Sequence, residues 1–470
     1  MILIKMFYRQ IRLLRSLSLC AAMLFAVPLV HAQSAPDSDE EEVADDSASE
    51  EDDELAQQEY LASPVTIPED VDDIDIPVPS FINNAANHII FNGADWSRLR
   101  DAVMQSTKHP VNIVHIGDSH IQADFSTSTT RRLLQYDFGN AGRGLIAPLK
   151  ISGTNQPTDY TFASRGAWTA NKLMSQSWRQ TVGFTGCSIH PNTNSSSLII
   201  STASPDDYDP FRSVTIFHTG RMQVTSVEDA EGNQLKYRAI PSKNYTQILL
   251  NEAVDGITVN FNSAGDLTVF GASLSGDRAG LFYHAIGNNG ATYATYNRIG
   301  NVGQGIAPLS PDLVIISCGT NEAFGRIDVA GFKSSIDRLV KNIRSANPDA
   351  LILLTTPMEC HKSVTTTKKQ RVRRKATRKR KAGWTTVNKK VKSYAVNPNI
   401  APLRDAILAY GKANGIAVYD WYDVAGGAGA SSSWIADNLF AKDRVHHSRT
   451  GYNLEGRLLY EALLDALRKQ

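Results

Sequence analysis

Five short apolar runs constrain the architecture of this chain more than any other feature. Each is four to six residues long, and they lie at residues 111–116, 281–286, 313–318, 351–354 and 416–419. Between them are stretches with apolar residues at helical spacing, such as the one that follows residue 328. Strands that alternate with helices form βαβ units, and these build a parallel sheet covered by helices on both faces. The sequence therefore predicts an α/β fold.

A different pattern separates the first two runs. Residues 151–279 contain short segments of alternating polarity, for example 214–218 and 257–261, with turn residues between them. This pattern is typical of an antiparallel β-sandwich. Because the α/β pattern resumes afterwards, we expect an inserted domain at 151–279. It would divide an α/β domain into a first part at 81–150 and a second part at 280–470.

The first 32 residues have the features of a secretory signal. Four basic residues precede an apolar stretch at 17–30, which is too short to span a bilayer comfortably. Small residues at 30 and 32 suit cleavage after Ala32. An uncleaved N-terminal anchor is the alternative. We expect an exported protein that is periplasmic, outer-membrane-associated or secreted.

Charge is distributed unevenly, although the formal net charge is zero. Between Asp37 and Asp75 there are 18 acidic residues and no Lys or Arg, so we expect 33–80 to be an acidic disordered linker. Residues 362–392 contain 14 Lys or Arg and no acidic residue. We expect a solvated basic loop there, which would attract an anionic polymer, a membrane surface or the chain's own acidic linker. The export signal disfavours nucleic acid as its partner.

The cysteines do not form a disulfide framework. After removal of the signal only Cys187, Cys318 and Cys360 remain. Cys318 ends an apolar run and is predicted to be a buried thiol. A bridge between Cys187 and Cys360 is permitted in an exported protein, but the sequence does not require one.

Ser119 is the candidate nucleophile. It follows the first apolar run in the sequence Gly117-Asp118-Ser119, and ligands of open α/β sheets bind beyond the carboxyl ends of the strands. A serine hydroxyl needs an imidazole to accept its proton and a carboxylate to orient that imidazole. Asp443 and His446 are three residues apart and can share one face of a turn. His447 is the alternative base, but its spacing from Asp443 is less favourable.

An acyl-transfer site also needs hydrogen-bond donors for the oxyanion. Strand ends supply three candidates, which are the backbone N–H of Ser119, the backbone N–H of Gly290 and the side-chain amide of Asn321. Glycine allows the substrate to approach the backbone closely, and an asparagine amide is a neutral donor of two protons. Each of these residues is equally compatible with ordinary turn chemistry.

Taken in order, these blocks resemble the SGNH (GDSL-type) hydrolases. The blocks are Gly-Asp-Ser at 117–119, Gly-x-x-Gly at 287–290, Gly-Thr-Asn-Glu at 319–322 and Asp-x-x-His at 443–446. The resemblance covers roughly 81–150 and 280–470 and implies a flavodoxin-like three-layer fold. It implies that Ser119 is the nucleophile, with Asp443 and His446 completing the triad. It also implies an oxyanion hole of Ser119, Asn321 and Gly290 rather than Gly287. The chain departs from the family pattern at His120, where leucine is usual.

The position of the inserted domain resembles one branch of this family, the bacterial two-domain peptidoglycan O-acetylesterases, whose insert is similar to a carbohydrate-binding module. The resemblance implies an exported serine esterase without cofactor that removes O-acetyl groups from a polysaccharide such as peptidoglycan. Trp168 and Trp178 in the insert are either core residues or platforms for sugar stacking.

Three alternatives remain open at this stage. The same triad would serve an O-acetyltransferase, with a sugar hydroxyl in place of water. A non-catalytic envelope protein that binds glycan through the sandwich is the second. A metallophosphoesterase site is the third, because His115, Asp118 and His120 surround the end of a strand. The Asn-His pair and the late Gly-His-x-His motif of such a site are missing from the sequence, so no metal is expected.

Overall fold

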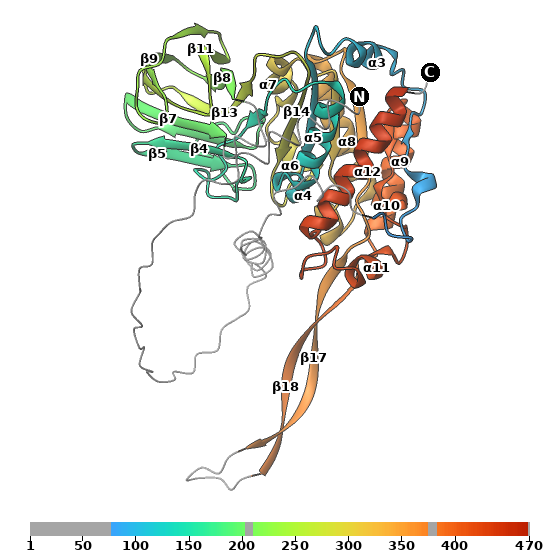
Figure 1. Cartoon of the computed structure of the whole chain (residues 1–470). Coiled ribbons are helices and arrows are strands. Elements are labelled where there is room, and N and C mark those ends of the chain that lie inside the picture. Colours follow the sequence, from blue (N-terminus) through green and yellow to red (C-terminus); the bar gives the residue numbers. More distant parts are fainter. Residues whose placement is uncertain (1–76, 203–209, 375–382, 469–470) are drawn as a thin grey trace, which may run out of the picture. The chain divides into compact units, whose positions relative to one another are not determined.

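The computed structural model describes residues 77–202, 210–374 and 383–468. The predicted signal at 1–32 and all but the last four residues of the predicted linker at 33–80 lie outside these ranges. All the described residues fall within one compact unit. Its elements and their labels are shown in Figure 1.

A six-stranded sheet forms the centre of the α/β part. Its spatial order is β1-β19-β16-β15-β2-β14. The strands are β1 (Ile89–Ile90), β2 (Val111–Gly117), β14 (Leu281–Gly287), β15 (Leu313–Ser317), β16 (Leu351–Thr355) and β19 (Ala417–Tyr419). The last five are parallel, and β1 adds an antiparallel edge. Counted along the chain, the parallel strands lie in the order 2-1-3-4-5, which is the flavodoxin-like order. The predicted fold class is confirmed.

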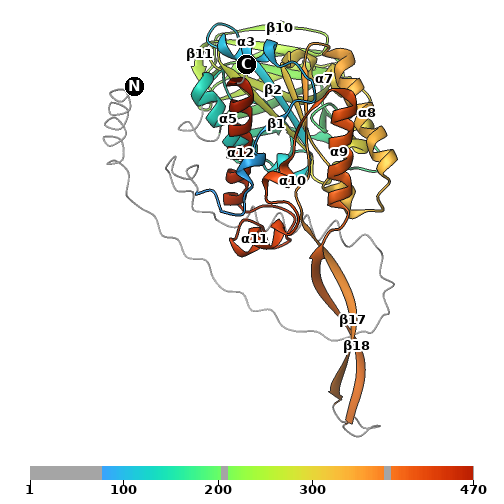
Figure 2. The ribbon, with the colours of Figure 1, turned by 90° about the vertical axis from the view of Figure 1, so that its right-hand side faces the viewer.

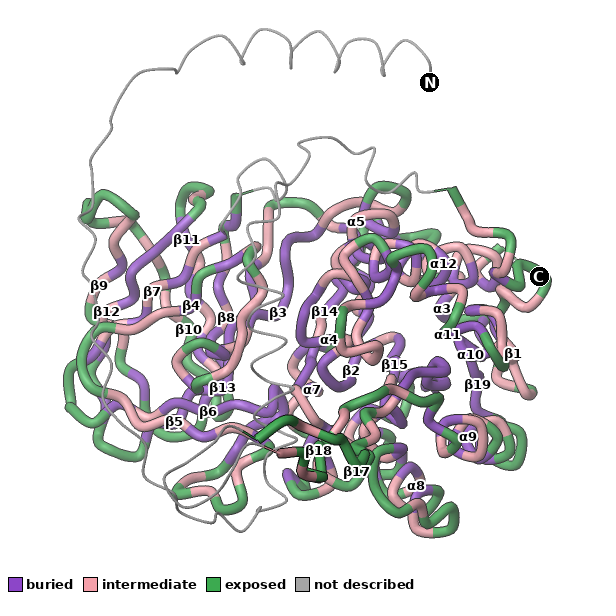
Figure 3. The backbone as a smooth tube through the Cα atoms, turned by 90° about the horizontal axis from the view of Figure 1, so that it is seen from below, coloured by how far each residue is buried: buried purple, intermediate pink, exposed green. Residues whose placement is uncertain are grey.

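Helices cover both faces of this sheet, as Figure 2 shows. One face carries α3 (Ser97–Met104), α5 (Phe125–Phe138) and α12 (Arg449–Arg468), and the other carries α6 (Tyr293–Asn297), α7 (Val302–Ile306), α8 (Val329–Ala346) and α9 (Ile400–Asn414). Helix α8 begins where Asp328 accepts hydrogen bonds from the N–H groups of Ala330 and Gly331. It buries a stripe of apolar residues at helical spacing against the sheet. The strands between the two layers are buried along most of their length (Figure 3).

Two antiparallel sheets are formed by the residues between β2 and β14. One has the order β10-β11-β8-β13-β6-β5, with β3 also paired to β13, and the other has the order β4-β7-β12-β9. The strands are β3 (Gly144–Ile146), β4 (Tyr160–Arg165), β5 (Trp168–Lys172), β6 (Cys187–Pro191), β7 (Ser195–Thr202), β8 (Phe211–Thr219), β9 (Met222–Glu228), β10 (Tyr237–Pro241), β11 (Tyr245–Val254), β12 (Gly256–Ser263) and β13 (Thr268–Ser275). Alternate residues of β7 are buried, as expected for a strand with one face in a core. Strand β3, at residues 144–146, pairs with β13 of these sheets.

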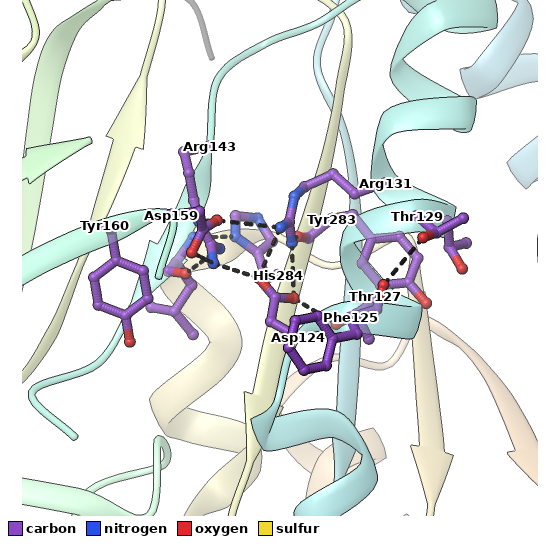
Figure 4. A network of polar contacts seen from close by, with 12 residues as sticks. Asp124, Phe125, Thr127, Thr129, Arg131, Arg143, Asp159, Tyr160, Tyr283 and His284 are labelled. Carbon is purple, nitrogen blue, oxygen red and sulfur yellow. Dashed lines mark hydrogen bonds and ion pairs between the residues drawn. The ribbon is translucent and has the colours of Figure 1, made fainter. Parts of the chain in front are cut away.

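A buried charge network connects the α/β part to these sheets (Figure 4). Asp124 lies just before α5 and accepts hydrogen bonds from Arg131 at 2.7 Å and from Arg143 at 2.6 Å. Arg143 also binds Asp159, just before β4, at 2.8 Å. We call these four residues the buried charge network. Two cations and two anions thus balance one another where water is largely excluded.

The structure corrects one expectation. The basic region at 362–392 is not a loop, because β17 (His361–Arg374) and β18 (Gly383–Val396) pair along their whole length in an antiparallel hairpin. The β-branched residues at 364–367 favour a strand, and the density of charge hid that signal. Residues 375–382, between the strands, are outside the described ranges.

The described cysteines are all free and buried, so Cys187 and Cys360 form no bridge. Trp168 and Trp178 are both partly buried against apolar clusters. None of the helices in the described residues is long and apolar enough to cross a membrane.

Candidate active site

Ser119 lies where β2 ends and the short helix α4 (Ser119–Gln122) begins. The Asp118 side chain caps this helix by accepting a hydrogen bond from the N–H of His120 at 3.0 Å. At Gly117 a Cβ would stand 2.7 Å from the carbonyl oxygen of Ser317 and still closer to Ile121, so no larger residue fits. The tight turn from strand to helix fixes Ser119 at the carboxyl edge of the sheet.

The structure brings Ser119, His446 and Asp443 into one hydrogen-bonded chain. Ser119 Oγ lies 2.7 Å from His446 Nε2, and His446 Nδ1 lies 2.6 Å from Asp443 Oδ2. The other carboxylate oxygen of Asp443 accepts hydrogen bonds from the N–H groups of Val445 and His446 at 2.9 and 3.0 Å. The acid is therefore held by its own loop, and it orients the imidazole toward the serine.

These contacts determine the charge state of Asp443. Burial alone would raise the pKa of its carboxyl group, but the hydrogen bonds from His446 and from the loop backbone outweigh burial, so the pKa is lowered. The carboxylate thus stays ionised at neutral pH. An ionised partner is what an imidazole needs when it takes up a proton.

His447, the alternative base, lies in a different environment. Its ring is buried and packs against Trp434 at a centroid distance of 4.9 Å and against Tyr452 at 5.0 Å. Its Nδ1 faces Glu455 at 3.4 Å. Only His446 of the pair is bonded to Ser119 in the described structure.

The two other predicted oxyanion donors, Gly290 and Asn321, differ in the hydrogen bonds that they already make. Gly290 has φ +73°, a conformation that favours glycine, and no hydrogen bond engages its N–H within the described residues. The Asn321 amide already donates to the carbonyl oxygen of Ala291 at 3.0 Å and to Asp118 Oδ2 at 3.2 Å. One of these two bonds must therefore be exchanged if the amide is to bind an oxyanion.

Two buried carboxyl groups surround Asn321. Burial raises the pKa of Asp118 to about 7 and the pKa of Glu322 to about 7. Glu322 Oε1 accepts a hydrogen bond from the N–H of Tyr293 at 2.9 Å, whereas Oε2 has no hydrogen-bond partner among the described residues. Below neutral pH the region around Asn321 therefore contains little negative charge, which suits a developing anion.

Sequence reasoning missed the residues that hold the glycine loop at 287–290. Gln122 Oε1 accepts a hydrogen bond from the N–H of Asn289 at 2.6 Å. Gln122 Nε2 donates to Thr154 and to Asn155 in the segment that leads to the sandwich. Nothing local in the sequence marks Gln122 for this role, because its partners are 32 or more positions away.

A second connection comes from the segment after β5. Met174 packs beside Gly290, where its Cε would stand 3.3 Å from a Cβ on the glycine. Arg298 fixes this segment by donating to the carbonyl oxygens of Leu173 and Ser175, and its guanidinium lies 4.5 Å from the centre of the Trp178 ring. Trp178 therefore contacts an arginine of the α/β part in the described structure.

The residues of the metal alternative do not converge. His115 is buried, with one ring nitrogen 2.7 Å from the Tyr283 hydroxyl and the other 2.6 Å from Ser317 Oγ. The His120 ring packs instead against His446 at a centroid distance of 5.2 Å. The described residues contain no cluster of His, Cys, Asp or Glu able to hold a metal ion.

Comparison with protein families agrees with this geometry. Residues 255–454 match the sequence model of the GDSL-like lipase/acylhydrolase family. This part of the chain, residues 255–454, is similar to the acylhydrolase domain of GDSL-type (SGNH) proteins. The match includes Gly290, Asn321, Asp443 and His446, whereas Ser119 lies before its first residue. The family match indicates a carboxylic ester hydrolase.

One solved structure supports the fold of the chain. A peptidoglycan O-acetylesterase matches with a TM-score of 0.62 and 21% identity over 81% of this chain and 99% of its own. A lipase/acylhydrolase from Enterococcus faecalis matches with a TM-score of 0.27 and 20% identity over 41% of this chain and 80% of its own. At that TM-score the second match carries no architectural argument. Among curated proteins, none matches this chain significantly.

Proposed function

We propose that the protein is a serine esterase that removes O-acetyl groups from a cell-wall or extracellular polysaccharide, with peptidoglycan as the first candidate. The observation that carries the proposal is the chain of short hydrogen bonds from Ser119 through His446 to Asp443. Similarity in fold to a peptidoglycan O-acetylesterase supports the choice of substrate. Export, predicted from residues 1–32, is part of the proposal.

The proposed mechanism has two steps. Ser119 Oγ attacks the ester carbonyl carbon while His446 Nε2 takes the serine proton, and Asp443 stabilises the imidazolium. The tetrahedral intermediate collapses, the sugar oxygen leaves with the proton from His446, and acetyl-serine remains. Water then attacks the acetyl-serine with His446 again as base, which releases acetate and restores the Ser119 hydroxyl.

The oxyanion of each intermediate would be bound by the N–H groups of Ser119 and Gly290 and by the Asn321 amide. The N–H of Ser119 is the first of α4, so it has no partner within the helix. Loss of one such donor costs about 100- to 1,000-fold in turnover. Asn321 contributes by exchanging its bond to Asp118 or to Ala291 for the oxyanion.

A short acyl group suits the space beside Gly290. Met174 stands so near this glycine that its side chain limits the room on that side of the loop. An acetyl group adds only one methyl to the carbonyl carbon, whereas a longer acyl chain would need the methionine to move. The position of Met174 therefore favours an O-acetylesterase over a lipase.

The test is release of acetate from O-acetylated peptidoglycan and from acetylated xylan by the wild type and by Ser119→Ala. We expect Ser119→Ala to lower the rate about 1,000-fold or more, because no other group supplies the nucleophile. Ser432→Ala, an exposed serine of α11 (Ala430–Ala436), is the matched control and should retain the full rate.

Wild-type rates from Ser119→Ala would disprove the mechanism. A faster reaction on xylan than on peptidoglycan would keep the mechanism and overturn the substrate. Adding a free sugar acceptor to the same assay separates hydrolysis from transfer, since a transferase would yield acetylated acceptor in place of acetate.

A further inference from the structure

The hairpin β17–β18 carries charge that the fold does not balance. Its described residues include nine Lys or Arg and no Asp or Glu, and the nine are Lys362, Lys368, Lys369, Arg371, Arg373, Arg374, Lys389, Lys390 and Lys392. Lys368 lies directly opposite Lys389, a pairing of like charges that destabilises a hairpin. The two strands pair only with each other, and most of their residues are exposed (Figures 1 and 3). Such a surface fits a polyanion.

The root of the hairpin is fixed to α11. Ser431 Oγ of this helix donates to Glu359 at 2.5 Å and lies 3.2 Å from His361 Nε2, at the start of β17. The opposite strand contacts the loop of the proposed triad, because the Arg444 guanidinium lies 4.6 Å from the centre of the Tyr394 ring. The hairpin therefore begins beside the candidate active site.

The first described residues of the chain reach the same place. The Phe81 ring packs against Trp434 of α11 at a centroid distance of 6.3 Å. Asn83 donates its N–H to the carbonyl oxygen of Val424 in α10 (Trp421–Val424) at 2.9 Å. The segment with 18 acidic residues at 37–75 thus joins the described chain only a few residues before a contact with the helix that holds the hairpin root.

We infer that β17–β18 is a docking surface for the chain's own acidic segment at 37–75. The charges are complementary, since the segment holds 18 acidic and no basic residues and the described strands hold only basic ones. The segment is also long enough to cover a strand of the hairpin. When it is extended at roughly 3.3 Å per residue, less than half of it matches the length of one strand. Because the segment belongs to the same chain, its effective concentration at the hairpin is on the order of millimolar. An external polyanion must compete with this concentration to bind the same surface.

Docking of this kind is electrostatic and therefore depends on salt. The charges of the hairpin are exposed, so their attraction to the segment is screened over roughly 10 Å at ~0.1 M salt. The segment would occupy the basic surface at low ionic strength, and a competing polyanion or added salt would displace it. The inference concerns binding by the hairpin and does not depend on the proposed esterase activity.

Zero-length carbodiimide cross-linking tests the docking directly, because it joins carboxylates to lysine amines that touch. In an equal mixture of isotopically light and heavy protein at low concentration, we expect cross-links from 37–75 to Lys368, Lys369, Lys389 and Lys390 within one copy. At ~0.5 M NaCl these cross-links should fall about tenfold or more. Links of the segment to other lysines, or only between light and heavy copies, would overturn the inference.

A deletion of residues 37–75 supplies a second measurement. Vesicles that contain phosphatidylglycerol should bind the deletion variant about tenfold or more tightly than the full chain at ~0.05 M NaCl. Replacing Lys368, Lys369, Lys389 and Lys390 with glutamine in the deletion variant should abolish this gain. Equal binding of vesicles by the full chain and the deletion would show that the segment does not cover the hairpin, and would overturn the inference.

Discussion

Two groups of charged residues in this protein, the buried charge network and the hairpin β17–β18, differ in burial and in pairing. In the buried charge network, Asp124, Arg131 and Arg143 have side chains at most 3% exposed, and each cation has an anion within 2.8 Å. In the hairpin β17–β18 the cations are exposed and the described strands contain no anion. Charge inside a fold is costly unless paired, whereas charge on an exposed hairpin is available to a partner. We therefore expect the first group to stabilise the fold and the second to bind a partner.

The largest effect should follow from breaking the buried charge network. Asp124→Asn removes one anion and leaves Arg131 and Arg143 short of a partner, which should lower the free energy of unfolding by about 3–5 kcal/mol. Asparagine tolerates the positive φ of 58° at this position, so backbone strain does not contribute. Urea unfolding measures the change. Asp101→Asn, an exposed carboxylate of α3, is the control and should be neutral.

The same residue predicts the behaviour in acid. Burial would raise the pKa of Asp124, but Arg131 and Arg143 outweigh burial and lower it. A carboxyl group with a lowered pKa contributes stability that is present above its ordinary pKa of 3.8 and is lost as pH falls below that value. The stability gap between wild type and Asp124→Asn should therefore narrow in acid. If the difference in the free energy of unfolding between wild type and Asp124→Asn stays constant to low pH, ionised Asp124 does not stabilise the fold in this way.

Glu322 is a buried carboxyl group that has no cation in hydrogen-bonding contact among the described residues, and its effect on stability should depend on pH in the opposite way. Its pKa is raised to about 7 by burial, so it stabilises the fold below pH 4.5 and that contribution is lost as pH rises to about 7. Glu322→Gln should gain stability over wild type by up to about 1.4 kcal/mol per pH unit in this window, and the gain should level off above it. Thermal unfolding at a series of pH values checks this. A gain independent of pH would refute the explanation.

The smallest effect is expected in the hairpin. Replacing Lys368 and Lys389 with threonine removes two opposed like charges and keeps residues that favour strands, so stability should change by less than about 0.5 kcal/mol. Urea unfolding under the conditions used for Asp124→Asn gives the comparison. A decrease of more than about 1 kcal/mol in the free energy of unfolding would mean that the hairpin lysines stabilise the fold. The hairpin would then not differ from the buried charge network in this respect.

The sequence predicted the parts of the molecule that local patterns encode. The parallel strands were visible as apolar runs because they are buried on both faces, and Asp443 and His446 were recognisable because they are three positions apart on one loop. The roles of these residues remain predictions, but the structure places them next to Ser119.

Features that depend on contacts between residues far apart in the sequence were not predicted. Strand β1 has two residues and exists only because β19 pairs with it. The left-handed Asp124 separates α4 from α5, and its carboxylate meets two arginines further along the chain. Gln122 joins three segments through side-chain hydrogen bonds that no periodic pattern records. In the hairpin, repulsion between lysines argued against a strand that cross-strand backbone pairing nevertheless forms.

The distance along the chain between Ser119 and His446 has a consequence for biosynthesis. The two residues are 327 positions apart, and β2 cannot pair with β14 until every strand of the antiparallel sheets has been made. At ~5–20 residues per second, the serine precedes its base from the ribosome by tens of seconds. Throughout that interval the proposed nucleophile has no imidazole beside it, so by the proposed mechanism only a finished protein can attack an ester.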